Sequence, residues 1–224
     1  MKPRTMNLAP PVSPKTDRQE NSASPKRLTI ADYHRLLEGG IIPESHQTEL
    51  IRGEIVEMSA KGSPHSVCTG LLCRQLDRMI GDQVAIRSQE PITLSNESEP
   101  EPDVTIAEGK LEDYLEHHPS PNQVLMIVEV ADSSLEYDRT IKLALYAEEN
   151  IPHYWIANVK SKQMECHSNP YQDSDGKFSY QSRQIIRSDQ RLSLPNFLTA
   201  DLDLENIFLK KSLKNLQTIR VAEI

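Results

Sequence analysis

Two carboxylates, Asp103 and Glu129, stand apart from the other acidic residues because of the stretches that contain them. Asp103 opens the strand-like stretch DVTIA after Pro102, and Glu129 interrupts the apolar run VLMIVEV 26 residues later. A lone ionised Glu among Val, Leu, Met and Ile is costly in free energy unless a partner compensates its charge. Binding of a cation between the two side chains would account for both.

The period of the second strand predicts where Glu129 points. Because side chains alternate along a strand, Glu129 shares a face with Leu125 and Ile127. If the two strands pair antiparallel, the start of one lies beside the end of the other, and both carboxylates meet at one edge of the sheet. A divalent cation would compensate them, and oxygen-only ligands favour Mg²⁺ or Mn²⁺ over zinc. The alternative is that Asp103 is a solvated strand opener and that Glu129 pairs with a nearby Arg or Lys.

Three helices are predicted to help position these residues, each beginning at a capping signal. The first is expected from the cap Thr29, with Asp32 as its partner, to Gly39. The second runs from Ser63, followed by Pro64, to about Gly81, and the third from Ser133, with Glu136 as its partner, to about Asn150. In the third helix the apolar residues expected to face the sheet are Ile141, Ala144 and Leu145, with Lys142 beside that face.

Strands are predicted before, between and after these helices. They are TELI and GEIVEMS around a turn at Arg52-Gly53, then QVAIRS, PITL, DVTIA, VLMIVEV and HYWIAN, and shorter polar strands between Gln163 and Leu194. The mixture predicts an α/β domain with a central sheet. Neither GxGxxG nor GxxxxGK[ST] occurs, which argues against nucleotide-cofactor chemistry.

Three longer stretches carry a resemblance to a known family. ELIRGEIVEMS, EPEPDV and VEVADSSLEYDRTIKLALYAEENIPHYWI together resemble the Uma-two family of proposed restriction endonucleases, and Pro102-Asp103 with Glu129 resembles the PD-(D/E)XK nuclease signature. The resemblance implies a restriction-endonuclease-like fold, in which helices flank a central mixed β-sheet. It also implies Mg²⁺- or Mn²⁺-dependent hydrolysis of nucleic-acid phosphodiesters, in the first place DNA, with Asp103 and Glu129 as catalytic metal ligands.

The lysine of that signature is displaced. Two residues after Glu129 stands Ala131, and in the resembled family the lysine has moved to the following helix, where Lys142 matches it. The resemblance therefore implies a catalytic role for Lys142. Its alternative role is an ion pair on the helix surface with Asp138, four residues earlier.

Other residues match the family less specifically. Glu49, at the start of the hairpin, matches an acidic residue that the fold often supplies, and its alternative is an exposed strand Glu. Gln89 also matches a family position, but no role is assigned to it. His65 at a helix start and Trp155, expected in the core, receive no role either.

The distribution of charge and proline along the sequence suggests how the chain is divided and which partners it can bind. Residues 1–27 hold five prolines and carry +4, whereas the whole chain carries −8, so the remainder carries −12. We expect a disordered leader (1–27), a restriction-endonuclease-like domain (28–209) and a C-terminal tail (210–224). The acidic body argues against sequence-blind adhesion to DNA and supports the rival interpretation of a catalytically silent binding or scaffolding module. A homo-oligomer or a partner that supplies specificity stays open.

The cysteines and the hydropathy of the sequence indicate the cellular compartment. The three cysteines form no CxxC pair, and no apolar run is long enough for a signal or a membrane span. We therefore expect reduced thiols in a cytoplasmic protein.

The leader gives a first testable prediction. Because its composition offers little apolar surface to bury, deletion of residues 1–26 is expected to leave the melting temperature nearly unchanged. Thermal unfolding followed by circular dichroism measures this, and a large drop would show that the segment is docked on the domain.

Overall fold

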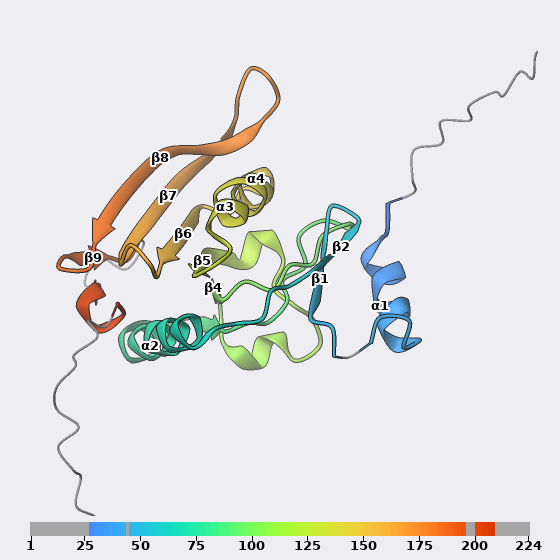
Figure 1. Cartoon of the computed structure of the whole chain (residues 1–224), viewed down its shortest axis with the longest axis horizontal. Helices are drawn as coiled ribbons and strands as arrows, with labels where there is room; N and C mark the ends of the chain where they lie inside the picture. The colour runs from blue at the N-terminus through green and yellow to red at the C-terminus, as the bar shows by residue number, and fades with distance from the viewer. Residues whose placement is uncertain (1–26, 44, 196–199, 209–224) are drawn as a thin grey trace, which may run out of the picture.

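The computed structural model describes residues 27–43, 45–195 and 200–208 (Figure 1). The expected leader, apart from Arg27, and the expected tail at 210–224 lie outside the described residues. Helical elements are α1 (Ile30–Glu38), α2 (Ser63–Ile80), η1 (Leu111–Tyr114), η2 (Pro121–Gln123), α3 (Leu135–Tyr137), the π-helix η3 (Asp138–Lys142), α4 (Leu143–Glu148) and η4 (Leu204–Asn206). Strands are β1 (Thr48–Ile51), β2 (Glu54–Glu57), β3 (Ala85–Arg87), β4 (Val104–Ala107), β5 (Val124–Ala131), β6 (His153–Asn158), β7 (Gln163–Gln172), β8 (Phe178–Arg187), β9 (Arg191–Ser193) and β10 (Asp201–Asp203).

A six-stranded mixed sheet in the order β3-β4-β5-β6-β7-β8 forms the centre of the fold. Its neighbouring strands are antiparallel except β5 and β6, which are parallel and place Glu129 opposite Ile156. The predicted mixed α/β fold with a central sheet is confirmed. Two short pairs, β1-β2 and β9-β10, lie beside this sheet.

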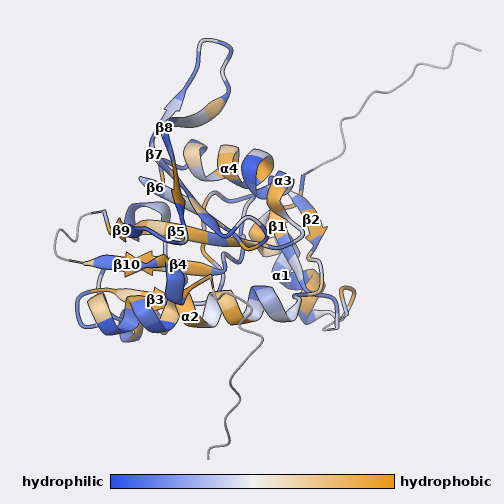
Figure 2. Cartoon of the chain, turned by 60° about the vertical axis from the view of Figure 1, so that its left-hand side comes forward, coloured by the Kyte–Doolittle hydropathy of each residue, from blue (hydrophilic) through white to orange (hydrophobic). Residues whose placement is uncertain are grey.

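Two apolar clusters cover the two faces of the sheet, because successive residues of β5 point to opposite sides. Met126 and Val128 pack in the cluster that contains Leu72 and Leu76 of α2. Ile127 packs in the other cluster, with residues of α4. The sheet therefore lies between α2 and the helical run from α3 to α4 (Figure 2).

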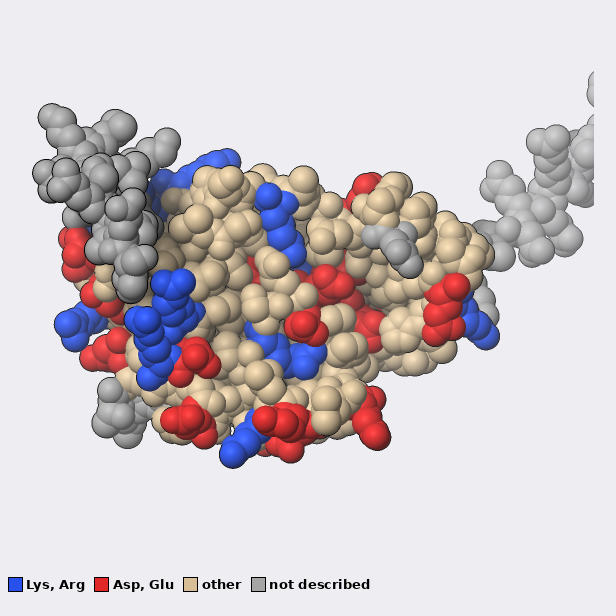
Figure 3. Space-filling model, turned by 90° about the horizontal axis from the view of Figure 1, so that it is seen from below, with Lys and Arg blue, Asp and Glu red and all other residues tan. Residues whose placement is uncertain are grey.

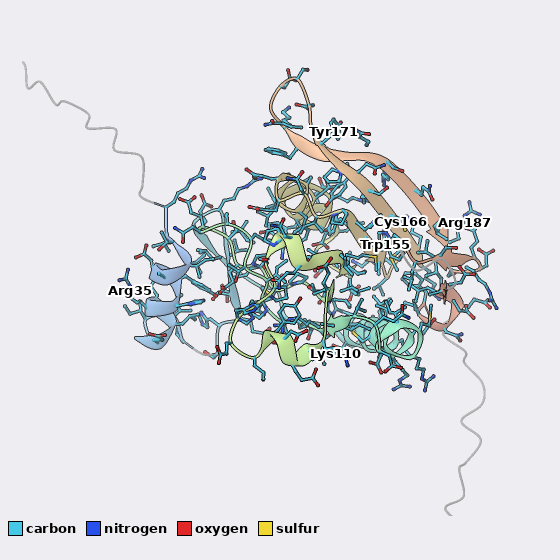
Figure 4. All side chains as sticks on the ribbon, turned by 180° about the vertical axis from the view of Figure 1, so that it is seen from behind. Arg35, Lys110, Trp155, Cys166, Tyr171 and Arg187 are labelled. Atoms are coloured by element: carbon cyan, nitrogen blue, oxygen red, sulfur yellow. The ribbon has the colours of Figure 1, made fainter. Side chains whose placement is uncertain are left out.

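Trp155 is part of the core, as predicted. It is buried on β6 and lies opposite Cys166 of β7 (Figure 4). The hairpin of β7 and β8 continues beyond the body, and Tyr171 lies on this projecting part (Figure 4). No helix among the described residues has both the length and the apolar composition needed to cross a membrane.

Capping and turn predictions agree with the structure in most places. Thr29 and Asp32 form the predicted capping box of α1. Arg52 and Gly53 have φ of 50° and 75°, the left-handed pair that a tight hairpin between β1 and β2 requires. The cap of α2 is Gly62 rather than Ser63, because the extended backbone ends one residue earlier than the sequence predicts.

The stretch PITL does not form the predicted strand. Ile92 and Leu94 are buried, but their N–H groups donate to the carbonyls of Pro100 and Ser98, whereas Thr93 donates to Pro119. The apolar residues that suggested a strand are buried in a loop whose backbone bonds go to other loops.

The helix after β5 departs further from the prediction. It starts at Leu135 after Ser134, which makes no capping bond with its side chain, and it ends at Glu148. Between α3 and α4 the N–H of Leu143 donates to the carbonyl of Asp138, a π-type bond over five residues. The sequence predicts a continuous α-helix, and this inserted turn changes which residues face the sheet.

Candidate active site

Asp103 and Glu129 lie together because β4 and β5 pair antiparallel, with Val104 opposite Val128. The N–H of Asp103 donates to Oε2 of Glu129 over 3.2 Å, and the N–H of Val130 donates to Oδ2 of Asp103 over 2.8 Å. Each carboxylate therefore accepts a backbone hydrogen bond from the strand of the other. The sheet brings together the two carboxylates that stood out in the sequence.

Asp103 accepts further hydrogen bonds from side chains on other elements. Nε2 of His65, in the first turn of α2, lies 3.0 Å from Oδ2, and Nε2 of Gln89 donates to Oδ1 over 3.1 Å. Burial favours the neutral acid, but His65, the N–H of Val130 and Gln89 together hold the pKa of Asp103 below its ordinary value. Asp103 is therefore an ionised group fixed in place.

Glu129 has a different electrostatic environment. Its side chain is buried, and Oε1 accepts a hydrogen bond of 2.7 Å from the hydroxyl of Tyr146. Burial raises the pKa of Glu129 to about 8, with Lys142 opposing the rise and Asp103 adding to it. The site thus holds an acidic group whose charge is not fully compensated by the protein.

Lys142 is buried beside these acids. Its Nζ lies 2.6 Å from Oε2 of Glu49 and 3.5 Å from Oε1 of Glu129, and 5% of the side chain is exposed. Burial disfavours the ammonium, but Glu129 and Glu49 raise the pKa of Lys142 above its ordinary value. Glu49 is itself buried on β1, so it is not the exposed strand residue of the alternative interpretation.

For this helix, one alternative interpretation and one expectation were wrong. Asp138, the partner in the alternative interpretation, accepts a hydrogen bond from the hydroxyl of Ser134, whereas Lys142 forms ion pairs with Glu49 and Glu129. Ile141 is 40% exposed, although the sequence places it against the sheet. The π turn rotates the helix so that Lys142 takes the inward position.

A cavity of about 450 Å³ opens beside these residues, between the segment from β2 to α2 and the turn from β5 to α3. Gly62 and Asp132 approach each other across it, since a Cβ added at Gly62 would lie 3.3 Å from Oδ2 of Asp132. The carboxyl groups that line the cavity belong to Glu49, Glu57, Glu101, Asp103, Glu129, Asp132 and Asp138, against the cations of Lys61 and Lys142. The cavity is strongly acidic.

Charged side chains of both signs lie on the face drawn in Figure 3. Acidic side chains gather near the middle of the face drawn in Figure 3, and the described Lys and Arg side chains of that face lie in separate small groups. Such a distribution provides local sites for cations rather than a broad basic track.

The oxygen donors of the site are of the type that a hard divalent cation prefers. Asp103 and Glu129 offer carboxylate oxygens at one edge of the sheet. Burial is the main cause of the raised pKa of Glu129, with the charge of Asp103 adding to it, and a bound cation would favour the ionised carboxylate. Within residues 27–43, 45–195 and 200–208 no group of three His, Cys, Asp or Glu side chains is arranged as a metal site. A cation would therefore depend on these two carboxylates together with backbone or solvent oxygens.

Sequence reasoning did not assign several residues of this site. His65 and Gln89 contact Asp103, and Tyr146 contacts Glu129. The only signal for His65 was its place at a helix start, and Tyr146 lay in an apolar helix pattern typical of a core residue.

Comparison with known proteins identifies a family and a solved structure with a similar fold. The family model described as "Putative restriction endonuclease", Uma2, matches residues 30–206. A search of the curated proteins finds no match. A crystal structure of "a putative nuclease belonging to DUF820 from Anabaena variabilis ATCC 29413" superposes with a TM-score of 0.60 at 12% identity, covering 81% of this chain and 97% of that one. At that identity the likeness shows the fold alone, whereas the family match spans the sheet and every residue of the site, so the chain belongs to the Uma2 family, which that model describes.

Proposed function

We propose that the protein is a Mg²⁺-dependent endonuclease that hydrolyses phosphodiester bonds, most readily those of DNA. The observation that carries the proposal is the buried ammonium of Lys142, placed 3.5 Å from Glu129 at the edge of the sheet where Asp103 also lies. A lysine and two carboxylates beside an open cavity supply the groups that this reaction needs. Family membership supports the same chemistry.

Asp103 and Glu129, with the main-chain carbonyl of Val130, would hold Mg²⁺ or Mn²⁺. When bound, such an ion polarises the phosphate and lowers the pKa of a coordinated water. Lys142 would orient the attacking oxygen and stabilise the charge that develops on the phosphate. The oxygen of this water would bond to phosphorus and its proton would pass to solvent, while the ester P–O bond breaks and the leaving oxygen takes up a proton from solvent.

Glu49 contributes by holding Lys142. Its Oε2 accepts hydrogen bonds from Nζ of Lys142 over 2.6 Å and from the N–H of Glu101 over 3.1 Å. With these contacts the main role of Glu49 would be to position the ammonium of Lys142, and it would reach a metal only through water.

A catalytically silent module is the second candidate. It is favoured by the acidic cavity and by the existing hydrogen bonds of both carboxylates, which stabilise the domain without a metal. In that case Asp103 and Glu129 would join the two strands and perform no chemistry.

An activity panel separates the two candidates. Purified protein is expected to cleave at least one of single-stranded DNA, duplex DNA, branched DNA or RNA with Mg²⁺ or Mn²⁺, and not with EDTA. Asp103→Asn serves as the matched inactive variant, because it keeps the side-chain shape. Cleavage that survives equally in Asp103→Asn would show a contaminating nuclease, and no cleavage of any substrate would favour the silent module.

A further inference from the structure

Tyr137 has a buried hydroxyl for which the described part of the chain provides no hydrogen-bond partner. Five buried side-chain atoms there share this property, namely Tyr137 Oη, His65 Nδ1, Arg87 Nε, Thr105 Oγ1 and His167 Nε2. Only His65 and Tyr137 among them line the cavity. A buried hydroxyl without a partner costs folding free energy, and in native proteins such a group calls for an explanation.

The π turn explains how Tyr137 comes to the catalytic side of the helix. Tyr137 ends α3 and Lys142 follows five residues later, at the end of the π segment. In an α-helix, residues five apart are separated by about 140° around the axis, whereas π-type bonding over five residues brings them near one side. Tyr137 and Lys142 accordingly line the same cavity.

The hydroxyl of Tyr137 stays protonated in this environment. Burial, followed by the charge of Glu49, raises the pKa of Tyr137 to about 12, with Lys142 acting in the opposite direction. The hydroxyl is therefore a neutral hydrogen-bond donor at physiological pH. No hydrogen bond among the described residues uses this hydroxyl, and Tyr137 lines the cavity, so an acceptor bound there would give the buried hydroxyl the partner that it lacks.

A phosphate oxygen is the acceptor that this arrangement suits. An acidic cavity repels a phosphodiester except where a cation and hydrogen-bond donors offset the repulsion. Lys142 and Tyr137, a cation and a donor, lie on the same side of the helical run and line the cavity together. We infer that Tyr137 is a catalytic residue whose hydroxyl donates a hydrogen bond to a non-bridging oxygen of the reacting phosphate. This inference rests on the proposed function, since it takes the phosphodiester as the ligand.

Tyr137→Phe tests the inference, because it removes one oxygen and leaves the ring. We expect kcat to fall at least about tenfold, because a donor to the charged phosphate is lost. The melting temperature should stay equal or rise, since a buried hydroxyl without a partner is removed. Tyr180→Phe is the matched control with the opposite pattern, because the hydroxyl of Tyr180 donates to the carbonyl of Ile151 over 2.9 Å and does not line the cavity.

In Tyr180→Phe the melting temperature should fall while activity per folded molecule is kept. A drop in melting temperature for Tyr137→Phe would show that its hydroxyl has a partner within the folded protein, and it would overturn the inference. Unchanged kcat in Tyr137→Phe, with active wild-type protein, would overturn it as well and leave the proposed function standing.

A binding measurement separates failure of the inference from failure of the proposed function. Calorimetry with thymidine 5′-monophosphate and Ca²⁺, which supplies a phosphate and a cation without requiring cleavage, is expected to give a weaker Kd for Tyr137→Phe than for wild type. Such a loss would support the phosphate contact even in a protein that cleaves nothing. Equal Kd values, or no binding by wild type, would overturn it.

Discussion

Lys142→Met is expected to lower phosphodiesterase activity by about 10²–10³-fold, the effect of removing one donor that stabilises charge in a transition state. The ammonium is the cation closest to Glu129 and lies inside the site, so water cannot readily take its place. The same change should cost about 3–5 kcal/mol of stability in metal-free protein, because it leaves the carboxylates of Glu49 and Glu129 buried without their counter-ion. Single-turnover cleavage and urea unfolding measure the two effects.

A double variant separates loss of chemistry from loss of folding. Adding Glu49→Gln to Lys142→Met removes one of the two acids left without a counter-ion, so stability should recover in part while activity stays low. Lys61→Met is the matched control, since Lys61 also lines the cavity but forms no ion pair within 4.0 Å among the described residues, and only a small change is expected. An active Lys142→Met enzyme, or equal losses in Lys61→Met, would contradict the catalytic role of Lys142.

Glu129→Gln is expected to abolish measurable Mn²⁺ binding and leave the fold intact. A glutamine has the same shape, its amide oxygen can accept from the N–H of Asp103, and its NH₂ can donate to the hydroxyl of Tyr146. The backbone and tyrosine contacts are therefore preserved, whereas the anionic ligand is lost. Electron paramagnetic resonance of free Mn²⁺ gives the affinity, and thermal unfolding checks the fold.

The specificity of this loss is tested by a second buried acid of the same cavity. Asp138→Asn removes a carboxylate whose pKa burial raises to about 6 and which accepts a hydrogen bond from Ser134. It should keep Mn²⁺ binding, while Asp103→Asn should lose it like Glu129→Gln. If all three variants bind Mn²⁺ equally, the assignment of Asp103 and Glu129 as ligands is wrong.

The meeting of Asp103 and Glu129 could be predicted because it follows from strand periodicity. Alternation fixes the face of Glu129 on β5, and antiparallel pairing with β4 brings the start of one strand to the end of the other. Side-chain alternation and the pairing of these two strands depend on short stretches of sequence. The same kind of reasoning predicted the capping box at Thr29 and the hairpin turn at Arg52-Gly53.

The inward position of Lys142 could not be predicted from periodicity. The segment DRTIK has no feature that distinguishes a π turn from an α-helix, and α-helical spacing places Ile141 against the sheet instead. Stabilisation of the turn comes from tertiary contacts, such as the hydroxyl of Tyr154 donating to the carbonyl of Asp138 over 2.9 Å. These contacts join residues whose proximity a one-dimensional pattern does not encode.

The contacts of Asp103 with His65 and Gln89 escaped prediction for a similar reason. They connect α2 and the loop after β3 to β4, and Gln89 adopts a left-handed φ of 57° at that point. Positive φ at a residue other than glycine or asparagine is rarely suggested by sequence. The surroundings of the carboxylates therefore became visible only in the folded chain.

The π turn between α3 and α4 makes chain length as important as residue identity. Removing one residue between Asp138 and Lys142 would let the helix return to α-type bonding and turn the lysine out of the cavity, although every side chain of the site would still be present. Conversely, an ancestor with a plain α-helix could have gained this geometry by one inserted residue, without exchanging any other. An alignment that forbids gaps here would match the lysine to the wrong column, and the site would then be mistaken for an incomplete one.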